Sequence, residues 1–276
     1  MSDRPLAIIT GASGGIGEAL ADEVAAKGYD LILIARSRHK LENVASRVAD
    51  THKIEAEAME LDLGIDGAAA QLKAALERKG VSPDLLINNA GYGLAGEFAD
   101  LPREKQLGMI DLNVRALTDI THALVGMMQE KSRAAKTDDG VKRGIINVAS
   151  TASFQPGPLM SVYYASKAYV LSFTEALGEE LRGDGLHVMA LCPGPTWSGF
   201  QDRAEFTNQK LLTMLPVMTA GQVARRCMDG FVGGKRVLIP GFFNWLMARS
   251  APFMPRRVLL PIVRFAQKGE TTAVSE

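Results

Sequence analysis

The sequence is poor in cysteine and has no long uninterrupted apolar run. Cys192 and Cys227 are the only two cysteines among 276 residues, they lie far apart, and they match no metal-ligand spacing. The sequence therefore predicts neither a disulfide framework nor a metal site, and it fits a reducing compartment. No apolar run reaches the roughly 18 to 20 residues that a membrane-spanning helix requires. The polar residues 1–6 lack the pattern of a signal peptide, so we expect a cytoplasmic protein.

An excess of charge of one sign is also absent. Lysine and arginine together number 31, as do aspartate and glutamate, so the formal net charge is zero. This balance gives no electrostatic reason to expect nucleic acid or an acidic partner. Hydrophobic residues make up 47% of the chain, which is enough for a full core and argues against disorder.

Short apolar runs alternate along the chain with segments of helical period. The central runs lack apolar–polar alternation, which is typical of parallel strands covered on both faces. The order predicts a doubly wound, Rossmann-type α/β fold, a three-layer αβα sandwich with a seven-stranded parallel sheet. The predicted strands are residues 6–10, 31–35, 54–60, 85–88, 144–149, 187–191 and 237–240, and the predicted helices are residues 16–27, 39–50, 67–79, 103–130, 162–182 and 220–231.

No linker divides the chain into two domains. We expect one domain over residues 1–241 that contains both a cofactor site and a substrate site. An extension over residues 242–276 follows, in which aromatic residues, prolines and arginines mix. The polar, charge-rich segment 131–143 is predicted to be an exposed loop.

A glycine-rich segment, TGASGGIG at residues 10–17, joins the first strand to the first helix. The start of a helix offers free N–H groups and the positive end of its dipole to a phosphate. Gly11 permits a sharp turn, Gly15 lets the backbone approach a pyrophosphate, and Gly17 allows close packing of the helix on the strand. The segment predicts a dinucleotide site, and a glycine-rich turn without a ligand is the alternative. The predicted contacts are Gly11, Ser13, Gly14, Gly15, Ile16 and Gly17.

The second strand ends in Ala35 and Arg36, where this fold often has an acidic residue that binds the ribose hydroxyls of NAD. A guanidinium offers planar, bidentate donors that suit a 2′-phosphate. We therefore predict NADP(H) as the cofactor, bound by Arg36 and Ser37, with Arg38 as a further contact. NAD(H) is the alternative cofactor, and a solvated surface role is the alternative for Arg36.

A tyrosine and a lysine four residues apart lie on a predicted helix. Tyr163 and Lys167 share one helix face, and an ammonium beside a phenol favours the phenolate and lowers a pKa that is about 10 when free. Such a tyrosine exchanges a proton with a carbonyl or alcohol oxygen. Tyr164 is excluded as the candidate because Ala168 lies four residues after it.

A serine at the end of the fifth strand completes the predicted catalytic set. Ser150 is expected at the carboxyl edge of the sheet, where open α/β folds bind their ligands. Thr151 and Ser153 are alternatives to it, and a turn serine without a catalytic role is another.

Together these motifs resemble the short-chain dehydrogenase/reductase (SDR) superfamily, in its short single-domain branch. The glycine spacing G-x-x-x-G-x-G and the Y-x-x-x-K motif carry the resemblance, which covers about residues 6–240. The other matching segments are Leu61-Asp62-Leu63, Asn88-Asn89-Ala90-Gly91, Asp111-Leu112-Asn113-Val114 and the Pro-Gly segment at residues 192–198.

The resemblance implies a role for each segment. Asp62 meets the adenine edge, for which a turn aspartate is the alternative. The Asn-Asn-Ala-Gly motif supports the sheet and lines the cofactor. Asn113 holds a water that links Lys167 to solvent as a proton relay, for which a satisfied helix asparagine is the alternative. The implied cofactor contacts are Asp62, Leu63, Asn89, Ala90, Gly91, Tyr163, Lys167, Pro193, Gly194, Thr196 and Ser198.

The activity implied is reduction of a carbonyl to an alcohol, or the reverse, with NADP(H). Tyr163 donates the proton, Ser150 holds the substrate oxygen, and Lys167 lowers the tyrosine pKa and binds the ribose. A non-catalytic NADP-binding sensor or scaffold, an NAD-dependent alcohol dehydrogenase, and an isomerase or dehydratase on the same fold are the alternatives.

Large apolar residues in segments 154–160 and 197–218 predict an apolar ketone, aldehyde or 3-oxoacyl substrate, and the second segment is long enough to act as a lid. The alternative is that both segments belong to the core. Family habit implies a homodimer or homotetramer. For the extension, a protomer interface, contact with a membrane surface and packing on its own domain all stay open. The large apolar residues of segments 154–160 and 197–218 are Phe154, Leu159, Met160, Trp197, Phe200, Met214 and Leu215.

Overall fold

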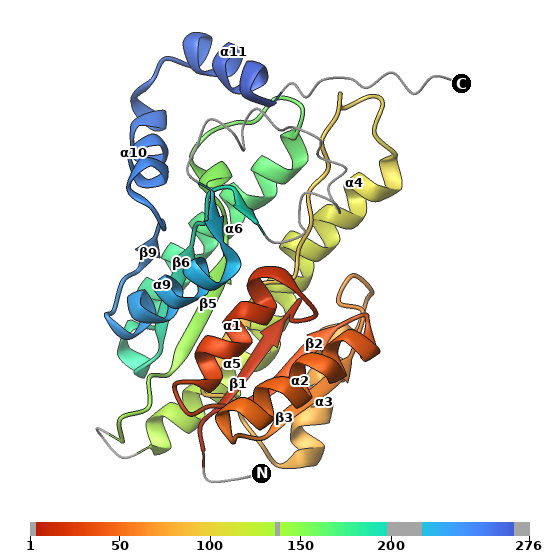
Figure 1. The fold of residues 1–276 in the computed structure, drawn as a ribbon, viewed down its shortest axis with the longest axis vertical. Helices are drawn as coiled ribbons and strands as arrows, with labels where there is room; N and C mark the ends of the chain where they lie inside the picture. Colours follow the sequence, from red (N-terminus) through yellow and green to blue (C-terminus); the bar gives the residue numbers. More distant parts are fainter. Residues whose placement is uncertain (1–3, 136–138, 198–216, 268–276) are drawn as a thin grey trace.

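A computed structural model describes residues 4–135, 139–197 and 217–267 of the chain. Its centre is a seven-stranded parallel sheet in the order β3-β2-β1-β4-β5-β6-β9, with helices on both sides (Figure 1). This order confirms the predicted doubly wound fold, whose switch point lies between β1 and β4. The strands are β1 (Leu6–Thr10), β2 (Asp30–Ala35), β3 (Ala56–Glu60), β4 (Leu85–Asn88), β5 (Gly144–Val148), β6 (His187–Leu191) and β9 (Val237–Leu238), while β7 (Thr196–Trp197) and β8 (Met218–Thr219) pair separately.

Helices cover both faces of the sheet. One core cluster joins α1, α2 and α9 to the strands, and a second joins α3, α5 and the end of α6 to the other face. Alternate strand residues supply the two clusters: Ile9 of β1 belongs to the first and Ile8 to the second. The helices and helical turns are α1 (Gly15–Ala25), α2 (Arg38–His52), α3 (Ala68–Lys79), α4 (Arg103–Ile110), η1 (Asp111–Ala116), α5 (Leu117–Ala134), η2 (Thr151–Phe154), α6 (Ser161–Glu180), η3 (Arg182–Asp184), α9 (Ala220–Val232), α10 (Phe242–Ser250), η4 (Ala251–Phe253) and α11 (Arg256–Gln267).

The helix predicted over residues 103–130 contains a π turn. α4 ends at Ile110, the π-helical turn η1 follows directly, and α5 begins at Leu117. The chain is therefore helical over the whole predicted range, but the π turn was not predicted because it inserts an extra residue without ending the helical pattern of the sequence. The turn contains Asn113, whose exposure is only 1%.

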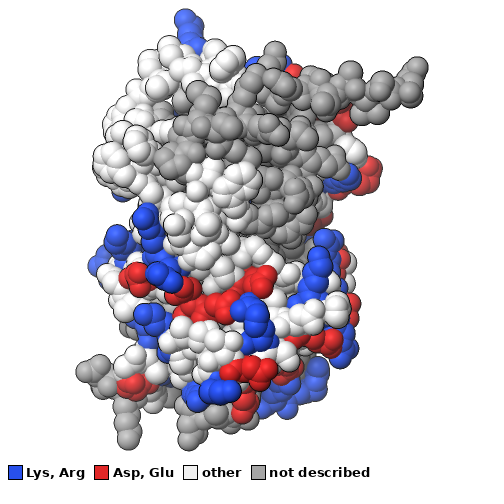
Figure 2. Space-filling view, in the orientation of Figure 1, with Lys and Arg blue, Asp and Glu red and all other residues white. Residues whose placement is uncertain are grey.

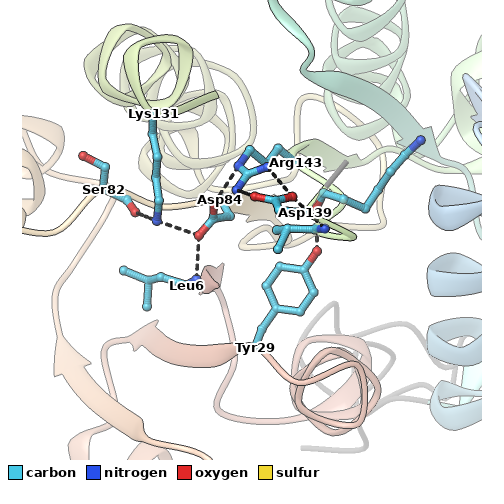
Figure 3. A network of polar contacts seen from close by, with 9 residues as sticks. Leu6, Tyr29, Ser82, Asp84, Lys131, Asp139 and Arg143 are labelled. Atoms are coloured by element: carbon cyan, nitrogen blue, oxygen red, sulfur yellow. Dashed lines mark hydrogen bonds and ion pairs between the residues drawn. The ribbon is translucent and has the colours of Figure 1, made fainter. Parts of the chain in front are cut away.

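A buried carboxylate ties the amino ends of the strands together (Figure 3). Asp84 accepts a hydrogen bond from the N–H of Leu6 at 2.8 Å and forms ion pairs with Lys131 at 2.6 Å and Arg143 at 2.9 Å. The prediction that segment 131–143 is an exposed loop is wrong at both ends, because α5 continues to Ala134 and both cations bind this carboxylate. The segment therefore stabilises the fold.

The extension folds into α10 and α11, at the top of Figure 1. Asn244 and Ala248 of α10 and Leu259 and Val263 of α11 are buried. In Figure 2 the described side chains of this upper region are largely uncharged on the face shown, whereas the lower region carries many charges of both signs. Among the described residues no helix has the length and apolarity to cross a bilayer. The apolar face of the extension comprises the exposed residues Phe242, Phe243, Trp245, Leu246, Met247, Phe253, Val258, Ile262 and Phe265.

Candidate active site

A cavity of about 940 Å³ lies at the carboxyl edge of the sheet. Loops after β1 to β6 and residues of α10 and α11 line it. Gly15, Gly17 and Asn113 do not line this cavity, and Ser198 lies outside the described residues. The predicted site residues on the wall are Gly11, Ser13, Gly14, Ile16, Arg36, Ser37, Asp62, Leu63, Asn89, Ala90, Gly91, Ser150, Tyr163, Lys167, Pro193, Gly194 and Thr196.

The glycine loop brings backbone close to the cavity. Gly11 and Gly15 have φ values of 66° and 61°, which side chains with a Cβ rarely adopt. A Cβ on Gly17 would lie 2.3 Å from the carbonyl oxygen of Gly11, so only glycine lets α1 start this close to the loop. A Cβ on Gly14 would meet nothing within 4 Å. Gly14 also provides no side-chain cap, which leaves the first N–H groups of α1 available to an anion. The backbone is therefore open to approach at Gly14, and the approach predicted at Gly15 stays a prediction.

Asn89 fastens the glycine loop to the end of β4. Its Nδ2 donates to the carbonyl oxygens of Thr10 at 3.0 Å and Gly11 at 3.1 Å. In return, Thr10 Oγ1 accepts from the N–H groups of Asn89 and Ala90, each at 3.0 Å. Asn88 turns into the core, where its Nδ2 donates to side chains of α5 and β5. The motif thus supports the sheet on one side and shapes the cavity wall on the other.

Two basic side chains lie where the cavity passes the end of β2. Arg36 and Lys40 line the wall, and neither forms a hydrogen bond or ion pair with any residue that the structure describes. Arg38 was predicted as a further contact, but it pairs with Glu42 at 2.7 Å and is not on the wall, so the structure gives that prediction no support. Lys40 was not predicted as a cofactor contact, although its position four residues after Arg36 could have indicated one.

Asp62 shapes a turn and lines the cavity, while its contact with the adenine edge stays a prediction. Its Oδ1 accepts a hydrogen bond from the N–H of Gly64 at 2.9 Å, which shapes the turn after β3. The exposed side chain also lines the cavity, next to the buried Leu63. The turn fixes the carboxylate at the wall.

Ser150 caps η2 and meets Tyr163 at the cavity. Its Oγ accepts from the N–H of Ala152 at 3.1 Å and donates to the carbonyl oxygen of Pro193 at 3.5 Å. Burial raises the pKa of Tyr163, and a hydrogen bond with Ser150, the smaller effect, lowers it. The end of β5 and the start of α6 thus bring the two predicted hydroxyls together.

Lys167 lies buried beside the Tyr163 ring. Its Nζ donates to the carbonyl oxygen of Val148 at 2.8 Å and lies 6.0 Å from the ring centroid of Tyr163. Burial lowers the pKa of Lys167 to about 8. The prediction that the pKa of Tyr163 is lowered is wrong for the protein without a ligand, because burial of the hydroxyl dominates and raises this pKa. The ammonium of Lys167 lies over the ring. Val148 engages one of the three N–H donors of Lys167.

Asn113 joins the cavity wall to the catalytic helix. Its Oδ1 accepts from the N–H of Tyr92 at 3.1 Å, and its Nδ2 donates to the carbonyl oxygen of Tyr92 at 2.9 Å and to Ser166 Oγ at 3.1 Å. Ser166 directly precedes Lys167 on α6. A Cβ on Gly91 would lie 2.8 Å from Asn113 Oδ1, so glycine is needed there. Asn113 is a satisfied asparagine that fixes α6 relative to the wall, and its role in holding water stays a prediction.

The extension contributes to the same cavity. A Cβ on Gly194 would lie 2.5 Å from the side chain of Asn244 on α10, so the Pro-Gly segment and α10 are in direct contact. The buried Asn244 donates to the carbonyl oxygen of Pro240 at 2.9 Å, and Thr196 Oγ1 donates to that of Gly194 at 2.9 Å. Residues on both sides of Gly241 therefore form one site.

Ala152 and Met160 of the cavity wall form an apolar cluster with Tyr164, against which Tyr163 packs. Met160 lines the cavity as predicted, but Phe154 packs in a core cluster, and Leu159 and Trp197 are not on the wall. Phe200, Met214 and Leu215 lie outside the described residues. The wall residues missed by the sequence analysis here are Leu94, Ala152, Gln155, Tyr164, Asn244, Met247, Ala248 and Gln267.

A family model described as short chain dehydrogenase matches residues 5–208. The chain belongs to the short-chain dehydrogenase family. Hydroxysteroid dehydrogenase-like protein 1 from Gallus gallus is 34% identical over 190 residues, which are 68% of this chain and 54% of that protein. Very-long-chain 3-oxoacyl-CoA reductase from Macaca fascicularis is 30% identical over 191 residues, which are 68% of this chain and 58% of that protein. The matches span little more than half the length of these relatives.

Among solved structures, a short-chain dehydrogenase from Sphingobium yanoikuyae in complex with NADPH is 30% identical, with a TM-score of 0.77. The match covers 96% of this chain and 99% of that one. Nearly the whole chain therefore has a structural counterpart, including most of the extension.

The cavity of this short-chain dehydrogenase fits a nicotinamide dinucleotide. Gly14 leaves open space beside the free N–H groups of α1, as a pyrophosphate requires. Lys167 keeps two N–H donors that no described residue engages, which suits ribose hydroxyls. Arg36 and Lys40 provide cations at the other end of the wall. The donor set thus matches the phosphate and sugar groups of such a cofactor.

Proposed function

We propose that this chain is an NADP(H)-dependent oxidoreductase that reduces a carbonyl to an alcohol or catalyses the reverse reaction. The observation that carries the proposal is the hydrogen bond between Ser150 and Tyr163 on the cavity wall, with the buried ammonium of Lys167 beside the same ring. A family fold hosts several chemistries, so the proposal depends on these three side chains.

The three side chains divide the proton chemistry between them. When bound, the nicotinamide supplies or accepts the hydride. During reduction the Tyr163 hydroxyl donates its proton to the substrate oxygen, which Ser150 holds beside it. Burial raises the pKa of Tyr163, which keeps the hydroxyl protonated at neutral pH and suits reduction. Lys167 binds the ribose, and Asn113 positions Lys167 through Ser166.

The cofactor preference that we propose is NADP(H). The two cations Arg36 and Lys40 on the wall favour a 2′-phosphate, and the solved relative from Sphingobium holds NADPH. NAD(H) remains the alternative, because Asp62 and the glycine loop would serve either dinucleotide.

The substrate class that we propose is an apolar ketone, aldehyde or 3-oxoacyl compound. Met160, Leu94 and Met247 support it, because they are apolar residues of the cavity wall and Met160 packs in the cluster that contacts Tyr163. The reductase from Macaca acts on a very-long-chain 3-oxoacyl-CoA, as its name states. A long apolar chain would suit such a wall by burying carbon.

The activity is tested by following NADPH oxidation with ketones, aldehydes and 3-oxoacyl thioesters in the wild type and in Tyr163→Phe. The substitution removes the proton donor and keeps the ring, so turnover should fall by roughly 10² or more while NADPH still binds. A sensor or scaffold would show no turnover in either protein. An isomerase or dehydratase would convert its substrate without net consumption of NADPH, and either result would contradict the proposal.

We also propose that the apolar face of the extension rests on an anionic membrane surface in the cytoplasm. Residues 242–267 contain four arginines and no aspartate or glutamate, and one of the four, Arg264, pairs with Glu97. Along α11, Val258, Ile262 and Phe265 form an exposed stripe at helical spacing, while Leu259 and Val263 are buried. A second copy of this face would oppose arginine to arginine, whereas anionic headgroups complement the charge. The homodimer or homotetramer implied by family habit stays a prediction for other surfaces.

Vesicle flotation tests this contact. The protein should float with vesicles that contain phosphatidylserine and less with pure phosphatidylcholine, and Phe265→Glu should reduce the floating fraction. If the protein fails to float with either vesicle and sediments as a dimer that Phe265→Glu dissociates, the face is a protomer interface instead.

A further inference from the structure

Next to Tyr163, the cavity wall holds a buried polar pair with one unsatisfied group. Gln267, the last residue of α11, is 5% exposed, and its Nε2 donates to the hydroxyl oxygen of Tyr164. Its Oε1 is buried and has no hydrogen-bond partner among the described residues. A buried acceptor without a donor costs roughly 1–3 kcal/mol, so folded proteins usually satisfy it. Both side chains line the cavity, from which a donor can come.

The pair is held firmly by its surroundings. Tyr164 follows Tyr163 on α6, and the centroids of their two rings lie 6.1 Å apart. A Cβ on Gly157 would lie 2.3 Å from the Tyr164 ring, so only glycine leaves room for the ring there. Gln155 also hydrogen-bonds the Tyr164 hydroxyl, and burial raises the pKa of Tyr164 to about 12. Tyr164 therefore stays neutral and serves as an anchor for Gln267.

The rest of this part of the wall is largely apolar. Ala152 and Met160 pack in one cluster with Tyr164 and against Tyr163, and Leu94 and Met247 are further wall residues of the cavity whose side chains contain only carbon and sulfur. A ligand that fills the space would bury apolar groups against them. It would meet polar side chains at the hydroxyls of Ser150 and Tyr163 and again at the polar pair. The two polar positions fix the orientation of a ligand that carries two polar groups.

We propose that Gln267, anchored by Tyr164, binds a hydroxyl group of the substrate, so that the preferred substrate is a ketone with a second, remote hydroxyl. The inference rests on the proposed function for the reacting carbonyl, but recognition of the hydroxyl is a separate step. Oε1 can only accept, so its partner must donate, as a hydroxyl does and a second carbonyl does not. A site built to bind a hydroxyl discriminates against the analogue that lacks it.

Equilibrium binding to protein saturated with NADP⁺ tests the proposal, because a ketone cannot be reduced in that complex. The probes are unbranched 2-alkanones from 2-hexanone to 2-dodecanone, each beside the same ketone with a terminal hydroxyl or with a second ketone at its far end. At one chain length the hydroxyl should lower the Kd by about 5- to 10-fold. Gln267→Met should remove this gain and leave the Kd of the plain 2-alkanone unchanged.

Two further variants complete the test. Gln71→Met makes the same change at an exposed position of α3, away from the cavity, and should keep the full gain. Tyr164→Phe removes the anchor without changing Gln267 and should reduce the gain, which provides a second measurement if Gln267→Met does not fold.

Three results would overturn the proposal: no gain from the hydroxyl at any chain length, a gain from the diketone instead, or a gain that survives Gln267→Met. NADPH oxidation with the plain 2-alkanones separates this failure from failure of the proposed function. A protein that reduces plain ketones but shows no hydroxyl preference keeps its activity and loses only this inference. A protein that binds the hydroxyketone through Gln267 without ever oxidising NADPH supports the inference and contradicts the activity.

Discussion

Replacing Arg36 with glutamine should weaken the binding of NADPH and leave that of NADH unchanged. Arg36 is exposed on the cavity wall and has no hydrogen bond or ion pair with a described residue. Its guanidinium therefore has no structural contact to lose, and the variant should fold as the wild type does. The 2′-phosphate distinguishes NADPH from NADH, so only NADPH should respond to the loss of the charge.

The size of the effect follows from the exposure of the side chain. A hydrogen bond to a charged group contributes about 1.5 to 3 kcal/mol, and the lower value applies because solvent screens an exposed pair. About 1.5 kcal/mol corresponds to roughly a 10-fold rise in the Kd of NADPH. Lys40 lines the same part of the wall, so the double variant with Lys40→Gln should lose more than either single variant. Added salt should weaken NADPH binding most in the wild type.

Fluorescence titration with NADPH and with NADH measures both affinities. Arg38→Gln is the matched control, because Arg38 is exposed two residues further on but pairs with Glu42 and does not line the cavity. That variant should bind both cofactors as the wild type does. An equal loss for NADPH and NADH in Arg36→Gln, or a loss as large in Arg38→Gln, would refute a direct contact between Arg36 and the 2′-phosphate.

Three other substitutions or conditions test separate parts of the structure. Gly14→Ala should keep the unfolding midpoint, because its Cβ meets nothing within 4 Å, but it should weaken cofactor binding by filling the open approach to α1. Gly17→Ala should instead lower the free energy of unfolding, measured by chemical denaturation, by roughly 1–3 kcal/mol. Asp84→Ala should cost about 3 kcal/mol of unfolding free energy, because it removes a buried carboxylate that accepts a hydrogen bond from the N–H of Leu6 and pairs with the partly buried Lys131 and Arg143, and a change in denaturation midpoint close to zero would contradict this. Burial raises the pKa of Tyr163, so the hydroxyl is protonated at neutral pH. The rate of alcohol oxidation, which needs the phenolate, should therefore rise with pH above neutral. The rate of ketone reduction, which needs the phenol, should not rise. Initial rates in both directions from neutral to alkaline pH check the sign, and a decline of oxidation with rising pH would be incompatible with it.

The parts of the fold that local pattern controls were predictable from the sequence. Strands such as β1 and β6 are short, continuously apolar and buried on both faces, so their bounds match the prediction. The π turn that contains Asn113 was not predictable, because one inserted residue leaves a helix-like pattern on both sides. The prediction of an exposed loop over residues 131–143 was wrong for a different reason. Lys131 and Arg143 pair with the buried Asp84, and no local sequence pattern identifies that partner.

The residues of the candidate site likewise form two groups, those that local sequence pattern predicts and those that depend on tertiary packing. Residues at strand ends and helix starts, such as Ser150 and Gly14, were predictable because parallel topology brings those ends to one edge. Phe154 was predicted at the substrate pocket for its size alone and packs in the core instead. Gln267 contacts Tyr164 across 103 positions of sequence, a contact that depends on how α11 packs and not on any motif. The wall residues that the extension contributes could therefore be identified only from the structure.

The central claim is that hydride passes between the nicotinamide and a carbonyl carbon with Tyr163 as the proton donor. The most direct measurement uses NADPH that carries deuterium on one or the other face of C4, an unbranched 2-alkanone, and mass spectrometry of the alcohol product. We expect one deuterium at the carbinol carbon from only one of the two labelled cofactors, and a yield of alcohol from Tyr163→Phe that is lower by roughly 10² or more. Alcohol without deuterium from either cofactor, or an undiminished yield from Tyr163→Phe, would contradict it.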